Sequence, residues 1–165
     1  MHYRQIVENH DPLNLWTFER YSGDLQNVFD EETNHTLLNN NTTLGESGQV
    51  NQNFSGRSAN LKGGDLIVAD GNYLDTQIAN RTFNISFVFK TDGTEITGLK
   101  PLVSKWEPDQ QFFIGFENGN LTAKIQTTSG LVECTIDNKY VIYNNYWNNV
   151  VFKVTSSAIK MCVPR

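Results

Sequence analysis

The sequence predicts an all-β fold, an antiparallel β-sandwich. Short segments in which apolar and polar residues alternate recur along the chain, above all in its second half. Turn-forming Asn and Gly residues separate these segments. No 3.6-residue period marks a helix over residues 20–64, and no helices alternate with the strands, which argues against a parallel α/β sheet. Without an internal repeat or a linker, the 165 residues predict an N-terminal arm over 1–12 and one domain over 13–165.

The first half carries weaker strand patterns. Residues 4–10 could form a short helix or an extended arm, which Pro12 ends. Residues 13–19 alternate and predict a half-buried strand that includes Trp16. The polar stretch over 20–64 offers further short strands, and the Gly63-Gly64 turn leads into another; these are expected at 36–38, 50–54 and 65–68.

The second half predicts a regular series of strands. Its segments are rich in Phe, Ile and Val, and the turn signals Asp92-Gly93 and Asn118-Gly119 lie between some of them. The expected strands are 83–90, 101–106, 112–116, 121–127, 131–136, 149–154 and 158–163. Their alternation and the pattern of 13–19 place five aromatic side chains in the core: Trp16, Phe87, Phe89, Trp147 and Phe152.

Charge and hydropathy exclude several classes of partner. The net charge is −5, and no cluster of Lys and Arg is present, so we expect no binding to nucleic acid. No apolar run approaches the roughly 20 residues of a membrane span. Residues 1–12 are polar and do not resemble a signal peptide, which predicts a protein made in the cytoplasm.

Several motifs in order resemble the laminin-G-like, concanavalin A-like jelly-roll family, in the versions found in phage structural proteins. These motifs are Asp11 to Glu19 with Ser22-Gly23 and Asp30, residues 83–89, Leu102 to Lys105, Phe112 to Gly115 with Gly119 to Leu121, and Tyr146 to Phe152. The resemblance implies an antiparallel jelly-roll sandwich. Its relatives continue with further strands after the position of Val163, so the final strands are expected to be missing or supplied by another chain.

The residues do not predict an enzyme. Glycoside hydrolases on related folds use two carboxylates that face each other across a cleft. Glu31 and Glu32 are adjacent in a loop, and the sequence contains no Glu-x-Asp-x-Glu run that would place carboxylates on one face of a strand. The three histidines, His2, His10 and His35, have no Ser or Cys partner in a catalytic pattern. We therefore expect no catalytic residues, with a glycosidase as the least favoured reading.

Two kinds of binding site are candidates. Calcium, the one cofactor considered, could bind the loop carboxylates Glu19, Asp24, Asp30 and Asp70, although solvated loop acids are the simpler interpretation. Carbohydrate could stack on aromatic residues near polar loops, namely Trp106, Tyr73, Tyr140 and Tyr143, with Tyr146 in a similar loop. Cys134 and Cys162 are expected to be buried free thiols, unless their strands are neighbours and form a disulfide.

These observations and the resemblance together favour a non-catalytic virion structural or adhesion module, such as a capsid decoration, fibre or tail component. Its expected partners are other virion proteins or copies of itself, with surface glycans as a further candidate. The alternative is a carbohydrate-binding module of a cellular surface protein, located at the cell surface or outside the cell.

Overall fold

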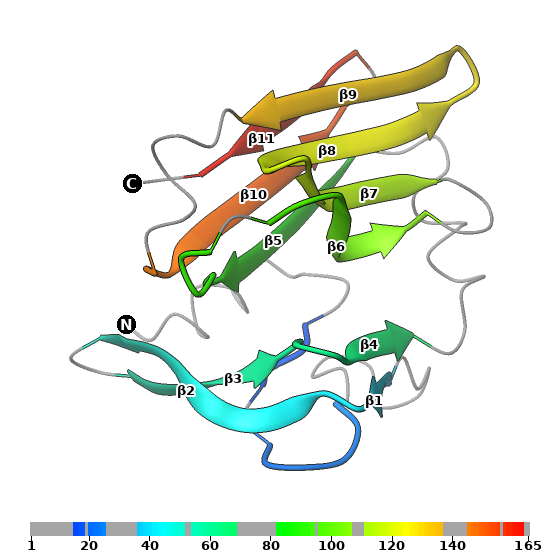
Figure 1. Cartoon of the computed structure of the whole chain (residues 1–165). Coiled ribbons are helices and arrows are strands. Elements are labelled where there is room, and N and C mark those ends of the chain that lie inside the picture. Colours follow the sequence, from blue (N-terminus) through cyan, green and yellow to red (C-terminus); the bar gives the residue numbers. More distant parts are fainter. Residues whose placement is uncertain are drawn as a thin grey trace. The chain divides into compact units, whose positions relative to one another are not determined.

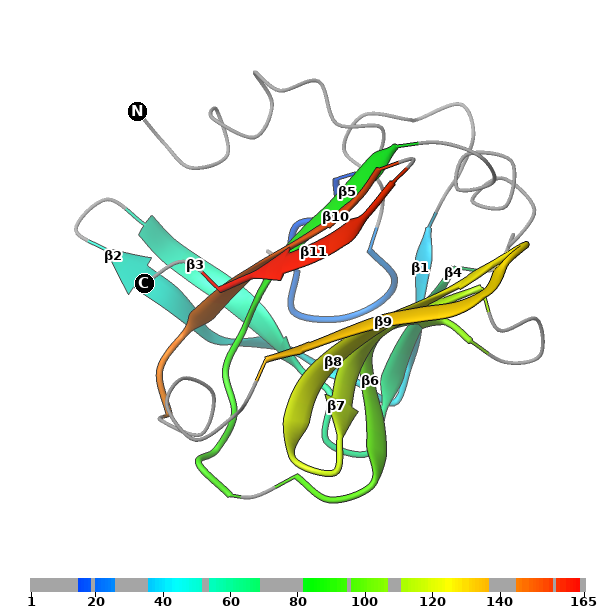
Figure 2. The same ribbon diagram turned by 90° about the horizontal axis from the view of Figure 1, so that it is seen from above.

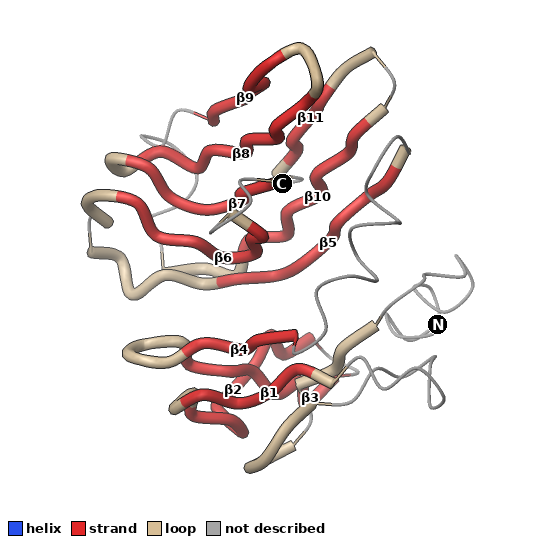
Figure 3. The backbone as a smooth tube through the Cα atoms, turned by 90° about the vertical axis from the view of Figure 1, so that its right-hand side faces the viewer, coloured by secondary structure: helices blue, strands red, loops and turns tan. Residues whose placement is uncertain are grey.

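The computed structural model describes residues 15–18, 20–25, 36–51, 54–68, 82–94, 96–106, 111–136, 145–155 and 157–163. These residues form antiparallel strands and loops, and none of them is helical (Figure 3). The all-β prediction is therefore confirmed. The chain divides into two compact units, Met1–Asp75 and Thr76–Arg165. The predicted boundary between an arm and a domain near residue 12 lies outside the described residues and stays a prediction.

The second unit contains two antiparallel sheets. In one, β10 (Asn148–Val154) pairs on one side with β11 (Ile159–Cys162) and on the other with β5 (Phe83–Phe89). The other sheet has four strands in chain order: β6 (Leu99–Lys105), β7 (Phe112–Glu117), β8 (Asn120–Thr127) and β9 (Gly130–Ile136). The two sheets form separate layers (Figures 1 and 2).

The layers pack face to face through two apolar clusters. The first joins Phe112, Ile114, Ala123 and Ile125 of the four-stranded sheet to Phe152 and Val154 of the other. The second joins Phe116 and Leu121 to Phe89 and Val150. All these residues follow the period of two that the sequence shows, because alternate side chains of a strand share a face. This unit is therefore sandwich-like.

The expected core aromatics are buried to different degrees. Phe89 and Phe152 are buried, as predicted, and Phe87 packs against both clusters while partly exposed. Trp16 and Trp147 are half-buried, so the prediction that they are core residues is wrong in degree. Trp147 immediately precedes β10, and this position at the end of the strand leaves it partly exposed.

Strand β7 is buried on both of its faces. Its inner side chains enter the core, while Phe113 on the outer face is also buried and packs edge-to-face against Trp106. Gly115 lies opposite Pro101, beside a register shift in β6. A Cβ at Gly115 would collide with the Lys100 carbonyl oxygen and would lie 2.8 Å from the Pro101 Cα. Glycine at this position therefore allows the two strands to approach.

The first unit contains two small antiparallel sheets. In one, β1 (Leu37–Asn40) pairs with β4 (Asp65–Val68); in the other, β2 (Thr43–Asn51) pairs with β3 (Phe54–Asn60). The predicted strand over 50–54 is wrong, because β2 ends and β3 begins within it and the two strands pair there as a hairpin. The predicted strand over 13–19 is also not seen in its described part, where Trp16 forms only an isolated bridge.

Candidate functional site

The last residue of β5 and the first residue of β10 meet at one end of the sandwich. Phe89 pairs with Asn148, so the segments that follow β5 and precede β10 leave the sheet side by side. Phe89 is buried beneath this end, edge-to-face with Phe116 at a centroid separation of 5.8 Å. Pairing between strands distant in the sequence thus brings Lys90 to Thr94 close to Asn145 to Trp147. We call these two segments the Tyr146 end.

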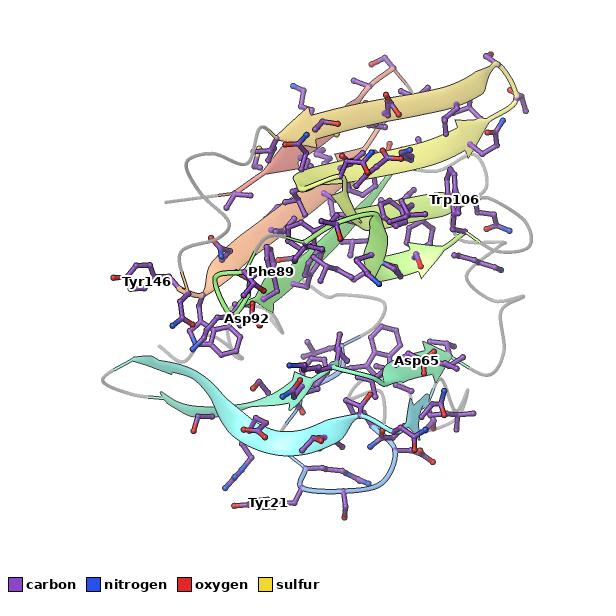
Figure 4. All side chains as sticks on the ribbon, viewed as in Figure 1. Tyr21, Asp65, Phe89, Asp92, Trp106 and Tyr146 are labelled. Carbon is purple, nitrogen blue, oxygen red and sulfur yellow. The ribbon has the colours of Figure 1, made fainter. Side chains whose placement is uncertain are left out.

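The short segment before β10 holds Tyr146 in solvent. Asn145 adopts a left-handed backbone conformation with φ of 55°, which Asn tolerates better than most residues. The buried Asn148 side chain donates a hydrogen bond from Nδ2 to the Tyr146 carbonyl oxygen at 3.0 Å. Tyr146 itself is 71% exposed and extends away from the ribbon (Figure 4). A hydrogen bond thus holds the backbone at Tyr146, and most of the residue is exposed.

The segment after β5 contributes charged groups. The Lys90 ammonium lies 6.0 Å from the centroid of the Trp147 ring, within reach of a cation–π interaction. The Asp92 carboxylate accepts a hydrogen bond from the Thr94 backbone N–H at 3.0 Å, which closes a tight turn. Figure 4 shows Asp92 at the same end of the sandwich as Tyr146.

This combination suits the binding of a polar ligand with an apolar face. The exposed aromatic ring offers a stacking surface, and the neighbouring Lys90 ammonium can donate hydrogen bonds. The sequence predicts a loop at Tyr146 and a turn at Asp92. That the two lie at the same end of the sandwich depends on the pairing of β5 with β10, which the local pattern does not indicate.

The predicted sugar-binding residues are mostly outside the described part of the chain. Tyr73, Tyr140 and Tyr143 lie there, so their grouping stays a prediction. Trp106 is described and half-buried, with its ring centroid 6.1 Å from that of Phe113. It lies at the opposite end of the sandwich from Tyr146 (Figure 4). Its described contact is a packing contact on the outer face of the four-stranded sheet.

Of the predicted calcium ligands, the structure describes only Asp24. Its Oδ1 accepts a hydrogen bond from the backbone N–H of Asn39 at 2.8 Å, which ties the loop to β1. Glu19, Asp30 and Asp70 lie outside the described residues. Within the described ranges, no three His, Cys, Asp or Glu side chains gather in a way that could hold a metal ion. The predicted set as a whole stays a prediction.

An ion-paired group crosses the outer face of the four-stranded sheet. The Lys124 ammonium lies 2.7 Å from Glu117 Oε1 and 3.9 Å from Glu133 Oε2. Lys124 and Glu133 are direct cross-strand partners of β8 and β9, and Glu117 comes from β7. Beside them, the hydroxyls of Thr122 and Thr135 lie 3.1 Å apart. These contacts link β7, β8 and β9 through their side chains. From the sequence alone, only the face of the strand on which each residue lies could be predicted.

The two cysteines are free thiols in edge strands of opposite sheets. Cys134 is half-buried against the core, whereas Cys162 is exposed, so the prediction that both are buried is wrong for Cys162. Cys162 follows Met161, which faces the core, and alternation turns its own side chain outward. Burial raises the pKa of the Cys134 thiol; a hydrogen bond involving the Ala123 backbone opposes this, and Cys162 adds a smaller increase.

Comparison of the chain with models of protein families, with curated proteins and with solved structures finds no match. The described residues also include no helix with the length and apolar character needed to cross a bilayer.

Proposed function

We propose that this chain is a non-catalytic recognition module of a virion structural or adhesion protein, built on a laminin-G-like jelly roll, and that the Tyr146 end is its contact surface. The main support for this proposal is the exposed Tyr146 side chain, whose backbone carbonyl accepts a hydrogen bond from Asn148. Lys90, Trp147 and Asp92 lie at the same end of the sandwich (Figure 4). The sandwich-like packing of the second unit agrees with a jelly roll. The favoured ligand is a surface glycan, whose ring would stack on Tyr146.

A glycan array probed with the labelled full chain tests this contact surface. Tyr146→Ala should weaken binding by about tenfold, because it removes the stacking ring. Lys153→Ala is the matched control, since Lys153 is also exposed and lies on β10 away from this end. An array without any bound glycan, or equal binding by the wild type and Tyr146→Ala, would contradict the proposed contact surface.

The virion assignment needs a separate experiment. Gold-labelled antibodies against the chain should mark purified particles in electron micrographs. Labelling of the producing cell's surface, with unlabelled particles, would instead favour the second candidate, a carbohydrate-binding module of a cellular surface protein. That alternative uses the same exposed ring and differs in the structure to which the module is attached.

A further inference from the structure

A second exposed aromatic ring lies in the first unit, on the ribbon formed by β2 and β3. Tyr21 is 68% exposed and projects away from the ribbon (Figure 4). Despite this exposure, two contacts fix the ring. The Arg57 guanidinium carbon lies 3.7 Å from the ring centroid, which is a close cation–π stack. The ring also lies against the backbone at Gly45.

Gly45 is adapted to this contact. It has a φ of 82° and lies at a register shift where Leu44 and Glu46 face consecutive residues of β3. This is the arrangement of a β-bulge with glycine in the left-handed region. A Cβ at Gly45 would lie 2.7 Å from Tyr21 Cδ1, so any other residue would displace the ring. The bulge thus positions Tyr21 without burying it.

The Arg57 guanidinium places one positive charge against the Tyr21 ring, although the whole chain carries a net charge of −5. Arg57 Nη1 contacts the Gly45 carbonyl oxygen at 3.5 Å, and no carboxylate in the described part of the chain forms an ion pair with Arg57. Glu46 pairs with Ser58, the neighbour of Arg57, so it lies on the other face of the ribbon. The guanidinium therefore keeps donors for a ligand.

We infer that Tyr21 and Arg57 form a binding site for an acidic sugar, a pyranose ring that carries a carboxylate. The sugar carboxylate accepts hydrogen bonds from the remaining N–H groups at the edge of the Arg57 guanidinium, a geometry that Arg favours, and the sugar ring packs against the exposed part of the neighbouring Tyr21 ring. A ring that is already fixed loses little conformational entropy on binding. This site uses no residue of the Tyr146 end, and it stands or falls independently of the function proposed there.

Titration of the isotope-labelled full chain with tetragalacturonate, followed by NMR, tests the site. Maltotetraose, which has no carboxylate, is the neutral comparison. Tetragalacturonate should shift the signals of the Tyr21 ring and the Arg57 side chain. Maltotetraose should bind at least about tenfold more weakly than tetragalacturonate. Because the signals are read residue by residue, shifts at Tyr146 report the other proposed surface separately.

Variants separate stacking from charge. Tyr21→Leu should weaken tetragalacturonate binding by about tenfold, while Tyr21→Phe, which keeps the ring, should bind within about threefold of the wild type. Arg57→Gln should remove the preference for the acidic probe, whereas Lys62→Gln, which removes an exposed positive charge elsewhere in the unit, should keep it. Backbone spectra check that each variant is folded. The inference is overturned if millimolar tetragalacturonate leaves Tyr21 and Arg57 unshifted, or if folded Tyr21→Leu binds as well as the wild type.

Discussion

Replacement of Phe152 by alanine tests the central packing of the sandwich. Phe152 is 0% exposed and lies on β10 between the two sheets, where its ring meets Phe83 edge-to-face at 6.2 Å and 68°. Truncation of a buried Phe to Ala costs about 3–5 kcal/mol in the free energy of unfolding. The aromatic pair contributes about 0.5–1.5 kcal/mol beyond burial. We therefore expect a loss near the upper end of that range for Phe152→Ala.

Two further variants make the measurement decisive. Phe152→Leu keeps most of the apolar volume and should cost less than about 1.5 kcal/mol, so it remains measurable if Phe152→Ala does not fold. Lys153→Ala changes the neighbouring, exposed residue and should alter the free energy of unfolding by less than about 0.5 kcal/mol. Urea unfolding followed by far-UV circular dichroism gives all three values.

The parity of β10 is what this comparison tests. A slip of one residue in the register would turn Lys153 inward and Phe152 outward. If Lys153→Ala destabilises the protein more than Phe152→Leu, or if Phe152→Ala costs less than about 1 kcal/mol, the assignment of the inner face of β10 is wrong.

Three other changes give distinct expectations. Gly115→Ala should cost about 1–3 kcal/mol in urea unfolding, because the added Cβ meets the backbone of Lys100, and wild-type stability would contradict the close approach of β6 and β7. Glu117→Gln should lower the free energy of unfolding by about 1 kcal/mol, more than Glu133→Gln does, because Glu117 is less exposed and lies nearer to Lys124. A larger loss for Glu133→Gln would refute this expectation. Alkylation of Cys134 by iodoacetamide, followed peptide by peptide in a mass spectrometer, should reach half its maximal rate above pH 9.0, the ordinary thiol pKa, because burial raises the pKa. Because the thiol of the unfolded chain loses its proton at a lower pH than the folded thiol, Cys134 should also make the free energy of unfolding fall as the pH rises above 9.0. An alkylation midpoint at or below pH 9.0 would contradict both the raised pKa and this loss of stability.

The strands of the second unit could be predicted because their side chains alternate with little interruption. In β5 and β10, Phe, Ile or Val recurs at every second position, and the burial largely follows that pattern. Strand β2 could not be predicted in the same way. Its Gly-Glu-Ser-Gly segment has few apolar residues, and two register shifts interrupt the period of two.

The candidate sites were less accessible to sequence reasoning than the strands. The segments at Asp92 and Tyr146 are far apart in the chain, and only the pairing of Phe89 with Asn148 brings them together. Similarly, the stack of Arg57 on Tyr21 depends on a bulge in a strand that the sequence did not predict. Composition and local pattern indicate which residue types are available. Long-range pairing decides which of them become neighbours.

The double burial of β7 has a consequence for the order in which the sandwich opens. β7 is paired on both sides, and five of its six residues are buried. We therefore expect its amide hydrogens to exchange with solvent mainly when the unit unfolds as a whole. The edge strands of the two sheets, β5, β6, β9 and β11, each pair on one side only within their sheet, and Leu131 and Val132 of β9 are exposed. Local fraying at these edges therefore precedes global unfolding, and the inner strands β7 and β8 form the last part of the sandwich to lose protection.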